Sequence, residues 1–258
     1  MPLDSTTISP VQTASISLQL RVSAITHRGT TRTENQDRVC VNGWTMASSM
    51  DAAFETVICP DEKCVVMVAD GMGGRNGGEI ASQTAIQFLS ARVPDAANLA
   101  ELNQVIIDAN KHLYDQMTGA TKGMGTTIVG LWFHEGTARY FNVGDSRVYR
   151  FDQSGIYQLS KDDTMAAYLG AKKSSSALLQ VLGGSNPERE IEPHIGSLLL
   201  KAETGFFLCS DGISDLIADD EILDMLRNHG NGAADELASL AFERGGHDNL
   251  TAIVVSVD

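Results

Sequence analysis

The chain has 258 residues, 43% of them hydrophobic, and a net charge of −14. This length fits one large domain, and so acidic a surface repels nucleic acid and anionic membranes, which argues against both as partners. The four cysteines form no CxxC pair, and neither an apolar span nor an export signal stands out, so we expect a cytoplasmic protein with reduced thiols and no structural zinc.

The first half of the chain shows strand patterns followed by two helical ones. Residues 1–16, rich in Ser, Thr and Gln, have no periodicity and are expected to form a loose tail. Residues 43–63 carry no clear pattern and are interpreted as a long excursion between strands. Alternating or continuous apolar residues predict strands, and apolar residues at helical spacing predict helices. In this half, the predicted strands lie near 16–22, 39–41 and 64–69, and the predicted helices lie over 80–89 and 99–113.

The second half shows a longer block of strands, two more helices and a last strand. Residues 163–185 are mixed in composition and are expected to form a short surface flap. The predicted strands are 128–133, 138–143, 148–151, 191–195, 206–210 and 250–257, and the predicted helices are 219–229 and 233–244. No repeat or linker divides the chain, so residues 17–258 are predicted to form a single domain. Strands and helices grouped in blocks indicate an α+β fold with antiparallel sheets.

Carboxylates stand at the edges of several predicted strands. Asp70 and Asp211 each end a buried apolar run and precede a glycine, which permits a sharp turn. Asp37 begins a strand, and Asp248 precedes the last one. Each element alone is weak evidence, because Asp-Gly is most often only a turn. If the four converge, their repulsion requires a cation, and oxygen ligands favour Mg²⁺ or Mn²⁺.

Six short segments together carry a resemblance to a known family. In chain order they are residues 32–37, 68–74, 123–127, 143–147, 210–212 and 246–249. In this order they resemble the motifs of the type 2C metal-dependent protein phosphatases, in their bacterial form. The resemblance runs from about residue 21 to the C-terminus. It implies a four-layer αββα sandwich, in which two antiparallel sheets are flanked by helix pairs.

The resemblance also implies a site for two Mn²⁺ or Mg²⁺ ions. Asp37, Asp70 and the backbone carbonyl of Gly71 look like ligands of one ion. Asp70, Asp211 and Asp248 look like ligands of the other, so Asp70 would bridge the two. Two such ions about 4 Å apart hold a bridging hydroxide and clamp a phosphoryl group for in-line attack.

Two further residues have roles implied by the resemblance, each with an alternative. Asp145 stands where family members hold a third, weaker ion shared with Asp211, but it is equally interpreted as a buried partner of Arg147. Arg32 stands where the family has its substrate-phosphate arginine, and a guanidinium suits a bidentate grip on phosphate. The alternative for Arg32 is a surface arginine in a charged loop.

Other positions depart from the family pattern. Met72 occupies the place of a histidine proposed as general acid in eukaryotic members, which leaves a metal-bound water or His247 as the donor, unless His247 is only a turn residue facing solvent. Many bacterial members have Asp-His-Ser/Thr after the central strands, but residues 162–164 contain no histidine. The segment 164–182 is also shorter than the family's usual flap. The glycine-rich residues 71–78 lack the Lys-Ser/Thr of a nucleotide-binding loop, which argues against nucleotide binding.

The expected function is hydrolysis of phosphoserine and phosphothreonine in proteins by direct attack of the metal-bridging hydroxide, without a phosphoenzyme. The expected partners are phosphorylated proteins and a cognate Ser/Thr kinase, and the chain is expected to act as a monomer. One alternative is a catalytically inactive regulatory binding module of the same fold. Another is a phosphatase of small phosphorylated metabolites, which would use the same metal site.

Overall fold

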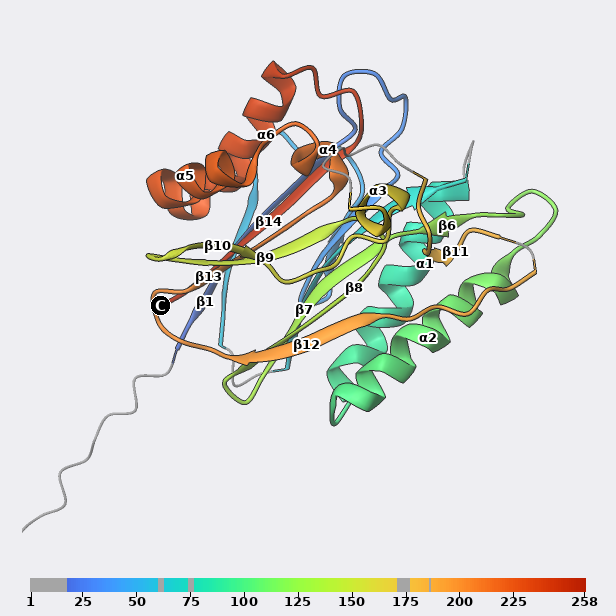
Figure 1. Ribbon diagram of the computed structural model, residues 1–258. Coiled ribbons are helices and arrows are strands. Elements are labelled where there is room, and N and C mark those ends of the chain that lie inside the picture. Colours follow the sequence, from blue (N-terminus) through green and yellow to red (C-terminus); the bar gives the residue numbers. More distant parts are fainter. Residues whose placement is uncertain (1–17, 60–62, 74–76, 171–176, 186) are drawn as a thin grey trace, which may run out of the picture.

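Two antiparallel β-sheets form the centre of the molecule in the computed structural model (Figure 1). The structure describes residues 18–59, 63–73, 77–170, 177–185 and 187–258. The tail expected at residues 1–16 lies outside these ranges. No helix in the described part of the chain combines the length and the hydrophobicity that crossing a bilayer requires.

The smaller sheet has six strands in the order β10-β9-β13-β14-β1-β4. Every neighbouring pair runs antiparallel. Its centre is formed by two apolar strands, β13 and β14, which are buried on both faces. The strands are β1 (Leu20–His27), β4 (Phe54–Ile58), β9 (Arg147–Asp152), β10 (Gly155–Gln158), β13 (Gly205–Cys209) and β14 (Leu250–Val257).

The larger sheet has eight strands and carries one side of the site described below. Six follow the order β11-β6-β5-β7-β8-β12, β2 pairs with β5, and β3 pairs with β2, all antiparallel. The strands are β2 (Asp37–Val41), β3 (Trp44–Met46), β5 (Cys64–Met72), β6 (Gly125–Thr126), β7 (Ile128–His134), β8 (Thr137–Val143), β11 (Leu182–Gly183) and β12 (His194–Leu199).

Two helix pairs cover the outer faces of the sheets (Figure 1). Helices α1 and α2 pack on the larger sheet, and α5 and α6 pack on the smaller one. Asn98 caps α2 by accepting a hydrogen bond from the Glu101 amide at 3.0 Å. The helices are α1 (Gly77–Arg92), α2 (Leu99–Gln116), α3 (Met165–Tyr168), α4 (Asp211–Ser214), α5 (Asp219–His229) and α6 (Ala233–Glu243), with 3₁₀ turns at Val93–Asp95 and Gly230–Gly232.

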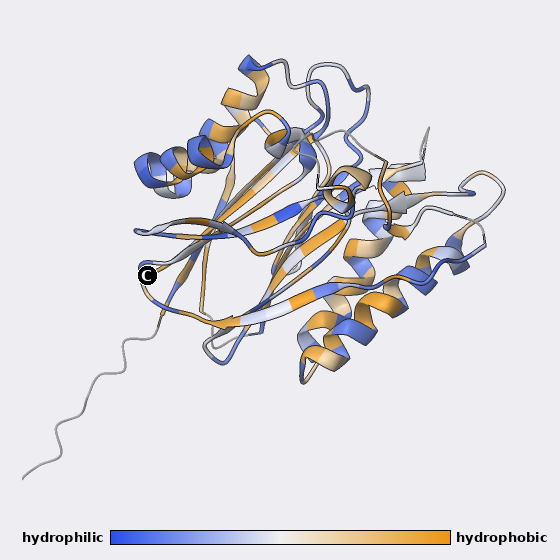
Figure 2. Cartoon of the chain, viewed as in Figure 1, coloured by the Kyte–Doolittle hydropathy of each residue, from blue (hydrophilic) through white to orange (hydrophobic). Residues whose placement is uncertain are grey.

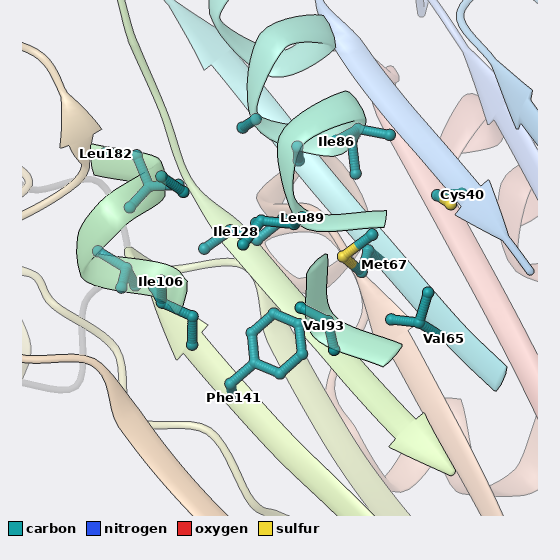
Figure 3. Packing of buried hydrophobic residues seen from close by; sticks show 14 of the residues in the cluster. Cys40, Val65, Met67, Ile86, Leu89, Val93, Ile106, Ile128, Phe141 and Leu182 are labelled. Carbon is teal, nitrogen blue, oxygen red and sulfur yellow. The ribbon is translucent and has the colours of Figure 1, made fainter. Parts of the chain in front are cut away.

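Three hydrophobic cores separate the four layers. One lies between the sheets, where residues such as Val68 and Phe206 are fully buried. The second lies beneath α1 and α2 and includes Met67, Leu89 and Ile106 (Figure 3), and the third lies beneath α5 and α6. Figure 2 shows hydrophobic residues along the strands and on the inner faces of the helices. The predicted αββα sandwich is confirmed.

Several details differ from the sequence-based expectations. The strand expected near 16–22 is β1, which begins at Leu20 and runs on to His27. Residues 43–63 contain two short edge strands, β3 and β4, each paired on one side only, and their half-exposed residues gave a weak pattern. Strand β5 continues past Ala69, because Gly71 and Met72 pair with β6. The edge strand expected at 191–195 begins at His194 instead, because Ile191 packs into the core beneath α2.

The expected flap at 163–185 is partly described. Residues 163–170 include the short helix α3, and an isolated bridge joins Thr164 to Leu178. Residues 171–176 lie outside the described ranges.

Candidate active site

A pocket of about 390 Å³ gathers residues from all six motif segments. Four of the five carboxylates considered as metal ligands line it, and the fifth, Asp37, is fully buried behind them. The lining residues are Arg32, Thr33, Glu34, Gln36, Asp70, Gly71, Met72, Gly73, Thr127, Asp145, Leu178, Asp211, Asp248 and Asn249.

Strand pairing explains why distant carboxylates meet here. Asp37 and Asp70 face each other as direct partners on β2 and β5. Asp211 follows the end of β13, and Asp248 precedes the start of β14, and these two strands pair antiparallel up to the Cys209–Ala252 rung. The end of β13, which leads to Asp211, and the start of β14, which follows Asp248, therefore lie together. Asp145 comes from the turn between β8 and β9 and completes the rim.

Hydroxyl groups hold Asp37 in one orientation. Ser210 Oγ and Thr251 Oγ1 donate hydrogen bonds to Asp37 Oδ2 at 2.8 and 2.7 Å. Thr251 Oγ1 also lies 2.7 Å from Thr26 Oγ1, which in turn accepts a bond from Asn35. Asp37 Oδ1, in contrast, is buried without any hydrogen-bond partner. A buried oxygen without a partner is costly, so its placement suits a metal ligand.

Gly71 allows three backbone segments to meet beside Asp70. A Cβ atom at Gly71 would lie 2.1 Å from the carbonyl oxygen of Gly78 in α1 and 2.7 Å from that of Gln36. The Gly71 amide donates to the Gln36 carbonyl at 3.2 Å. Only glycine fits this approach of β5, α1 and the loop before β2. Gly71 lines the pocket, as expected of a residue that offers a backbone carbonyl to a cation.

Burial and mutual repulsion weaken the acidity of these carboxyl groups. Burial, opposed by its two hydroxyl donors, raises the pKa of Asp37 to about 7. Burial and then the charge of Asp211 raise the pKa of Asp145 to about 7, and burial and then Asp248 raise the pKa of Asp211 to about 6. Burial and the neighbouring carboxylates raise the pKa of Asp70 well above its usual value. A bound cation would relieve the repulsion among these like charges and stabilise their deprotonated forms.

The donor set fits hard divalent cations. Every candidate ligand is an oxygen atom, and Asp211 Oδ1 is a second buried oxygen without a hydrogen-bond partner. Within the described ranges, no three acidic, histidine or cysteine side chains stand close enough to form a finished coordination sphere. The carboxylates would therefore have to close in on a cation, as expected of like charges that repel one another when none is bound.

Arg32 lines the pocket and bonds to one of the candidate ligands. Its Nη2 donates to Asp248 Oδ2 at 2.7 Å, and this hydrogen bond is the largest cause of the raised Arg32 pKa. The loop that carries Arg32 is fixed by Asn249, whose side chain accepts from the Gln36 amide and donates to the Glu34 carbonyl. The guanidinium is thus held at the mouth of the pocket, half exposed.

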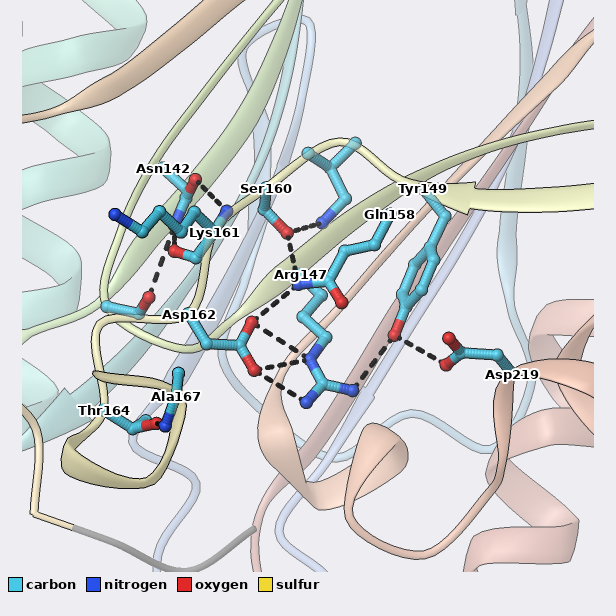
Figure 4. Close-up of polar contacts among 12 residues, drawn as sticks. Asn142, Arg147, Tyr149, Gln158, Ser160, Lys161, Asp162, Thr164, Ala167 and Asp219 are labelled. Carbon is cyan, nitrogen blue, oxygen red and sulfur yellow. Dashed lines mark hydrogen bonds and ion pairs between the residues drawn. The ribbon is translucent and has the colours of Figure 1, made fainter. Parts of the chain in front are cut away.

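Asp145 is not the partner of Arg147. The Arg147 guanidinium binds Asp162, with Nε and Nη2 donating to Asp162 Oδ2 at 3.0 and 2.7 Å, and its Nη1 donates to Tyr149 (Figure 4). Tyr149 in turn donates to Asp219 at 3.1 Å. The alternative role considered for Asp145 is therefore wrong, and its carboxylate faces the pocket beside Asp211.

No histidine of the described residues lines the pocket. His247 is exposed, and its Nδ1 lies 3.2 Å from Thr31 Oγ1. This placement agrees with a turn residue facing solvent and offers no support for His247 as a general acid. Met72 lines the pocket.

Several supporting residues were not identified as such from the sequence. Ser210 and Thr251 orient Asp37, and Asn249 fixes the Arg32 loop. Thr127 accepts a hydrogen bond from the Asp70 amide at 3.1 Å and contacts Ser146 at 2.7 Å. Four of these five lie within the six motif segments, so their position in these segments was the available signal. Thr251 had none.

Comparison with known proteins gives consistent results. Residues 47–244 match the family model described as Protein phosphatase 2C. The chain is 30% identical over 261 residues to the serine/threonine protein phosphatase PstP of Mycobacterium tuberculosis, covering 95% of this chain and 46% of that protein, so it spans about half the length of this relative. It is 30% identical to the serine/threonine phosphatase stp of Listeria monocytogenes, covering 90% of this chain and 94% of that protein.

Solved structures show the same architecture. The catalytic domain of PstP in complex with two manganese ions has a TM-score of 0.74 and 30% identity, covering 93% of this chain and 99% of that one. The sandwich, the pocket of carboxylates and these similarities lead to one conclusion: this chain belongs to the protein phosphatase 2C family.

Proposed function

We propose that this chain is a metal-dependent phosphatase that hydrolyses phosphoserine and phosphothreonine in proteins and so opposes a Ser/Thr kinase. The observation that carries this proposal is the convergence of Asp70, Asp145, Asp211 and Asp248 on one pocket, with Asp37 buried behind them. The manganese ions of the PstP structure support the choice of metal. We propose further that the chain from residue 17 onward acts as one catalytic domain, as a monomer in the cytoplasm.

The protein's own residues would divide the work at this site. Asp37, Asp70 and the Gly71 carbonyl would hold one Mn²⁺ or Mg²⁺, and Asp70, Asp211 and Asp248 the other. When bound, two such ions activate water and neutralise charge on the phosphoryl group. Ser210 and Thr251 would keep Asp37 in a fixed orientation, which holds its unpaired Oδ1 toward the ligand set.

Arg32 would position the substrate phosphate. A guanidinium offers parallel N–H donors that match two phosphoryl oxygens. Arg32 already lies at the mouth of the pocket, where its present partner, Asp248, is itself a proposed metal ligand. Because no histidine of the described residues lines the pocket, the proton for the leaving alkoxide would come from water. Asp145 and Asp211 would hold a third, weaker ion.

The proposal is tested by phosphate release from a phosphothreonine peptide and from an aryl phosphate, with Mn²⁺, with Mg²⁺ and with chelator. We expect metal-dependent turnover of the peptide that Asp211→Asn abolishes and that Asp224→Asn, on the exposed face of α5, leaves unchanged. Metal and peptide binding without turnover would indicate a regulatory binding module. Turnover of small phosphates alone would indicate a metabolite phosphatase, and either result would overturn the proposal.

A further inference from the structure

Two smaller pockets continue the catalytic pocket along strand β3. The first, of about 240 Å³, shares Glu34 with the catalytic pocket, and the second, of about 200 Å³, shares Ala47 with the first. None of the described residues that line the two belongs to the flap. We call the two together the β3 groove, because residues 45–49 line them from end to end.

The register of β2 and β3 explains the course of this groove. Asp37 begins β2 directly behind the catalytic pocket, and Met46, the last residue of β3, lies opposite Val39. Strand residues advance about 3.3 Å each, so β3 ends only about 7 Å along the sheet from Asp37. The residues that follow Met46 lead back toward the site. A chain that leaves the catalytic pocket therefore reaches the groove within a few residues.

Strand β3 offers an unused pair of backbone groups to the groove. Asn42 and Gly43, both with positive φ (46° and 89°), form the two-residue turn that joins β2 to β3. In such a hairpin the rung beside the turn exchanges hydrogen bonds and the next rung does not. That next rung is Cys40 with Thr45, so the N–H and C=O of Thr45 point away from β2. Within the described ranges β3 pairs with β2 alone, and its outer edge can take another strand.

Helix α1 forms the opposite wall of the groove. Thr45 lies on the helix-facing side of the sheet, since its partner on β2 packs in the core beneath α1. Gln83 and Gln87 are exposed one turn apart on α1 and line the same pocket as Thr45. Arg38 also lines this pocket, and its nearly buried guanidinium donates to Glu79 of the adjoining pocket at 3.0 Å. A strand edge that faces a helix in this way is a known geometry for binding an extended peptide by strand addition.

We propose that the β3 groove binds an extended segment of the phosphoprotein substrate, which adds to β3 as a further strand on one side of the phosphorylated residue. This inference rests on the proposed function. An extended chain advances about 3.5 Å per residue, so the bound segment would lie about three to six residues from the phosphorylated one. The groove would recognise main-chain groups, and it would therefore select for chain length and extended conformation.

Continuity with the catalytic pocket favours a substrate chain over other occupants. The charged residues that line the groove are two of each sign, Arg28, Arg38, Glu34 and Glu79, which agrees with main-chain recognition and favours neither an acidic nor a basic partner. The three residues of β3 are too few to hold a second folded copy by strand pairing alone. A chain already held by its phosphate, in contrast, needs only a few added hydrogen bonds.

The test compares phosphothreonine peptides that extend one, four or eight residues on either side of the phosphothreonine. We expect kcat/KM to rise by about tenfold when the peptide is lengthened on one side only, which is the contribution of one or two hydrogen bonds. Ala47→Phe, which fills the junction of the two pockets, should abolish this gain. The matched control is Ala100→Phe, at an exposed position of α2 that lines neither pocket, and it should keep the gain.

A second variant addresses the backbone of β3 directly. Thr45→Pro removes the N–H that points away from β2 and leaves the two hydrogen-bonded rungs of the hairpin intact, as proline on an edge strand does. It should reduce the gain from peptide length. Because the gain is a ratio measured within one variant, a partial loss of folded protein does not alter it.

A binding measurement separates failure of this inference from failure of the proposed function. The same peptides, with a non-hydrolysable phosphonate in place of phosphate, are titrated in fluorescence anisotropy. Affinity that grows with length on one side and that Ala47→Phe removes supports the groove even if no turnover occurs. Equal kcat/KM and equal affinity at all lengths, or a gain that survives Ala47→Phe, would overturn the inference while metal-dependent turnover upheld the enzyme. Concentration-dependent dimers lost in Ala47→Phe would overturn it too, and would assign the groove to self-association.

Discussion

Replacing the buried Asp37 by Asn is expected to stabilise the metal-free protein at alkaline pH. Asp37 is fully buried beside other carboxylates, and burial raises its pKa from 3.8 to about 7. Since its folded-state pKa lies above the unfolded value, the folded state holds the proton more tightly, and stability is lost as pH rises through this range. Asparagine keeps the shape of the side chain and removes the charge.

The size of the effect follows from the pKa and from hydrogen bonding. A rise from 3.8 to about 7 corresponds, at 1.36 kcal/mol per pKa unit, to on the order of 4 kcal/mol at pH 8 and less than half of that at pH 5. The asparagine amide would leave one buried donor unsatisfied, which costs about 1–3 kcal/mol. The variant should therefore be more stable by about 1–3 kcal/mol at pH 8, a rise in Tm of about 3–10 °C. At pH 5 the difference should be close to zero.

Metal should reverse this order. A cation favours the deprotonated carboxylates, and ligand at a hundred times its Kd stabilises a folded protein by about 2.7 kcal/mol. The unaltered protein should therefore gain about 5–10 °C in Tm with saturating Mn²⁺ at pH 8. The Asp37→Asn variant should gain much less, because the amide carries no negative charge and replaces one carboxylate oxygen by an NH₂ group, which cannot bind a cation.

The assay is thermal unfolding by scanning calorimetry at pH 5, 6.5 and 8, with chelator and with Mn²⁺. Asp224→Asn, at an exposed position of α5, serves as the control and should shift Tm by little at any pH. A Tm for Asp37→Asn that is lower than that of the unaltered protein at pH 8 without metal would refute the reasoning. A difference that does not depend on pH would refute it equally.

Three further expectations concern single side chains around the site. Arg32→Ala should lower kcat/KM for phosphopeptides by about 10–100-fold, which is the contribution of one charge-assisted hydrogen bond. The affinity for Mn²⁺, measured by calorimetry, should not fall, because Asp248 loses only a competing cation. A parallel loss of Mn²⁺ affinity would contradict this expectation. Gly71→Ala should destabilise the fold by about 3 kcal/mol or more, because its Cβ would meet a carbonyl oxygen at 2.1 Å; an unchanged melting curve in circular dichroism would disprove the close packing. Asp162→Asn should cost on the order of 2–4 kcal/mol, since it leaves the largely buried Arg147 without a charged partner, and an unaltered denaturant midpoint would show that Arg147 has another partner.

The amino-acid sequence by itself determined the class of the fold, α+β with antiparallel sheets, and the family resemblance implied its four layers and the carboxylates of the site. Long apolar runs such as 64–69 and 206–210 are buried on both faces, so their pattern is strong and local. The helices over 99–113 and 219–229 have clear apolar faces for the same reason. The order of the six motif segments, seen through the family resemblance, then placed Asp70 and Asp211 in one site.

Only the tertiary structure decided how the side chains pair. Ser210 and Thr251 lie 173 and 214 residues from Asp37, and no local pattern links them. Arg147 binds Asp162 and leaves Asp145 to the pocket, because the β9–β10 hairpin returns the chain beside Arg147. Short edge strands such as β3 and β4 could also be located only in the tertiary structure, because they are largely exposed and their apolar pattern is weak. Periodicity records burial along one segment, whereas these choices depend on which segments become neighbours.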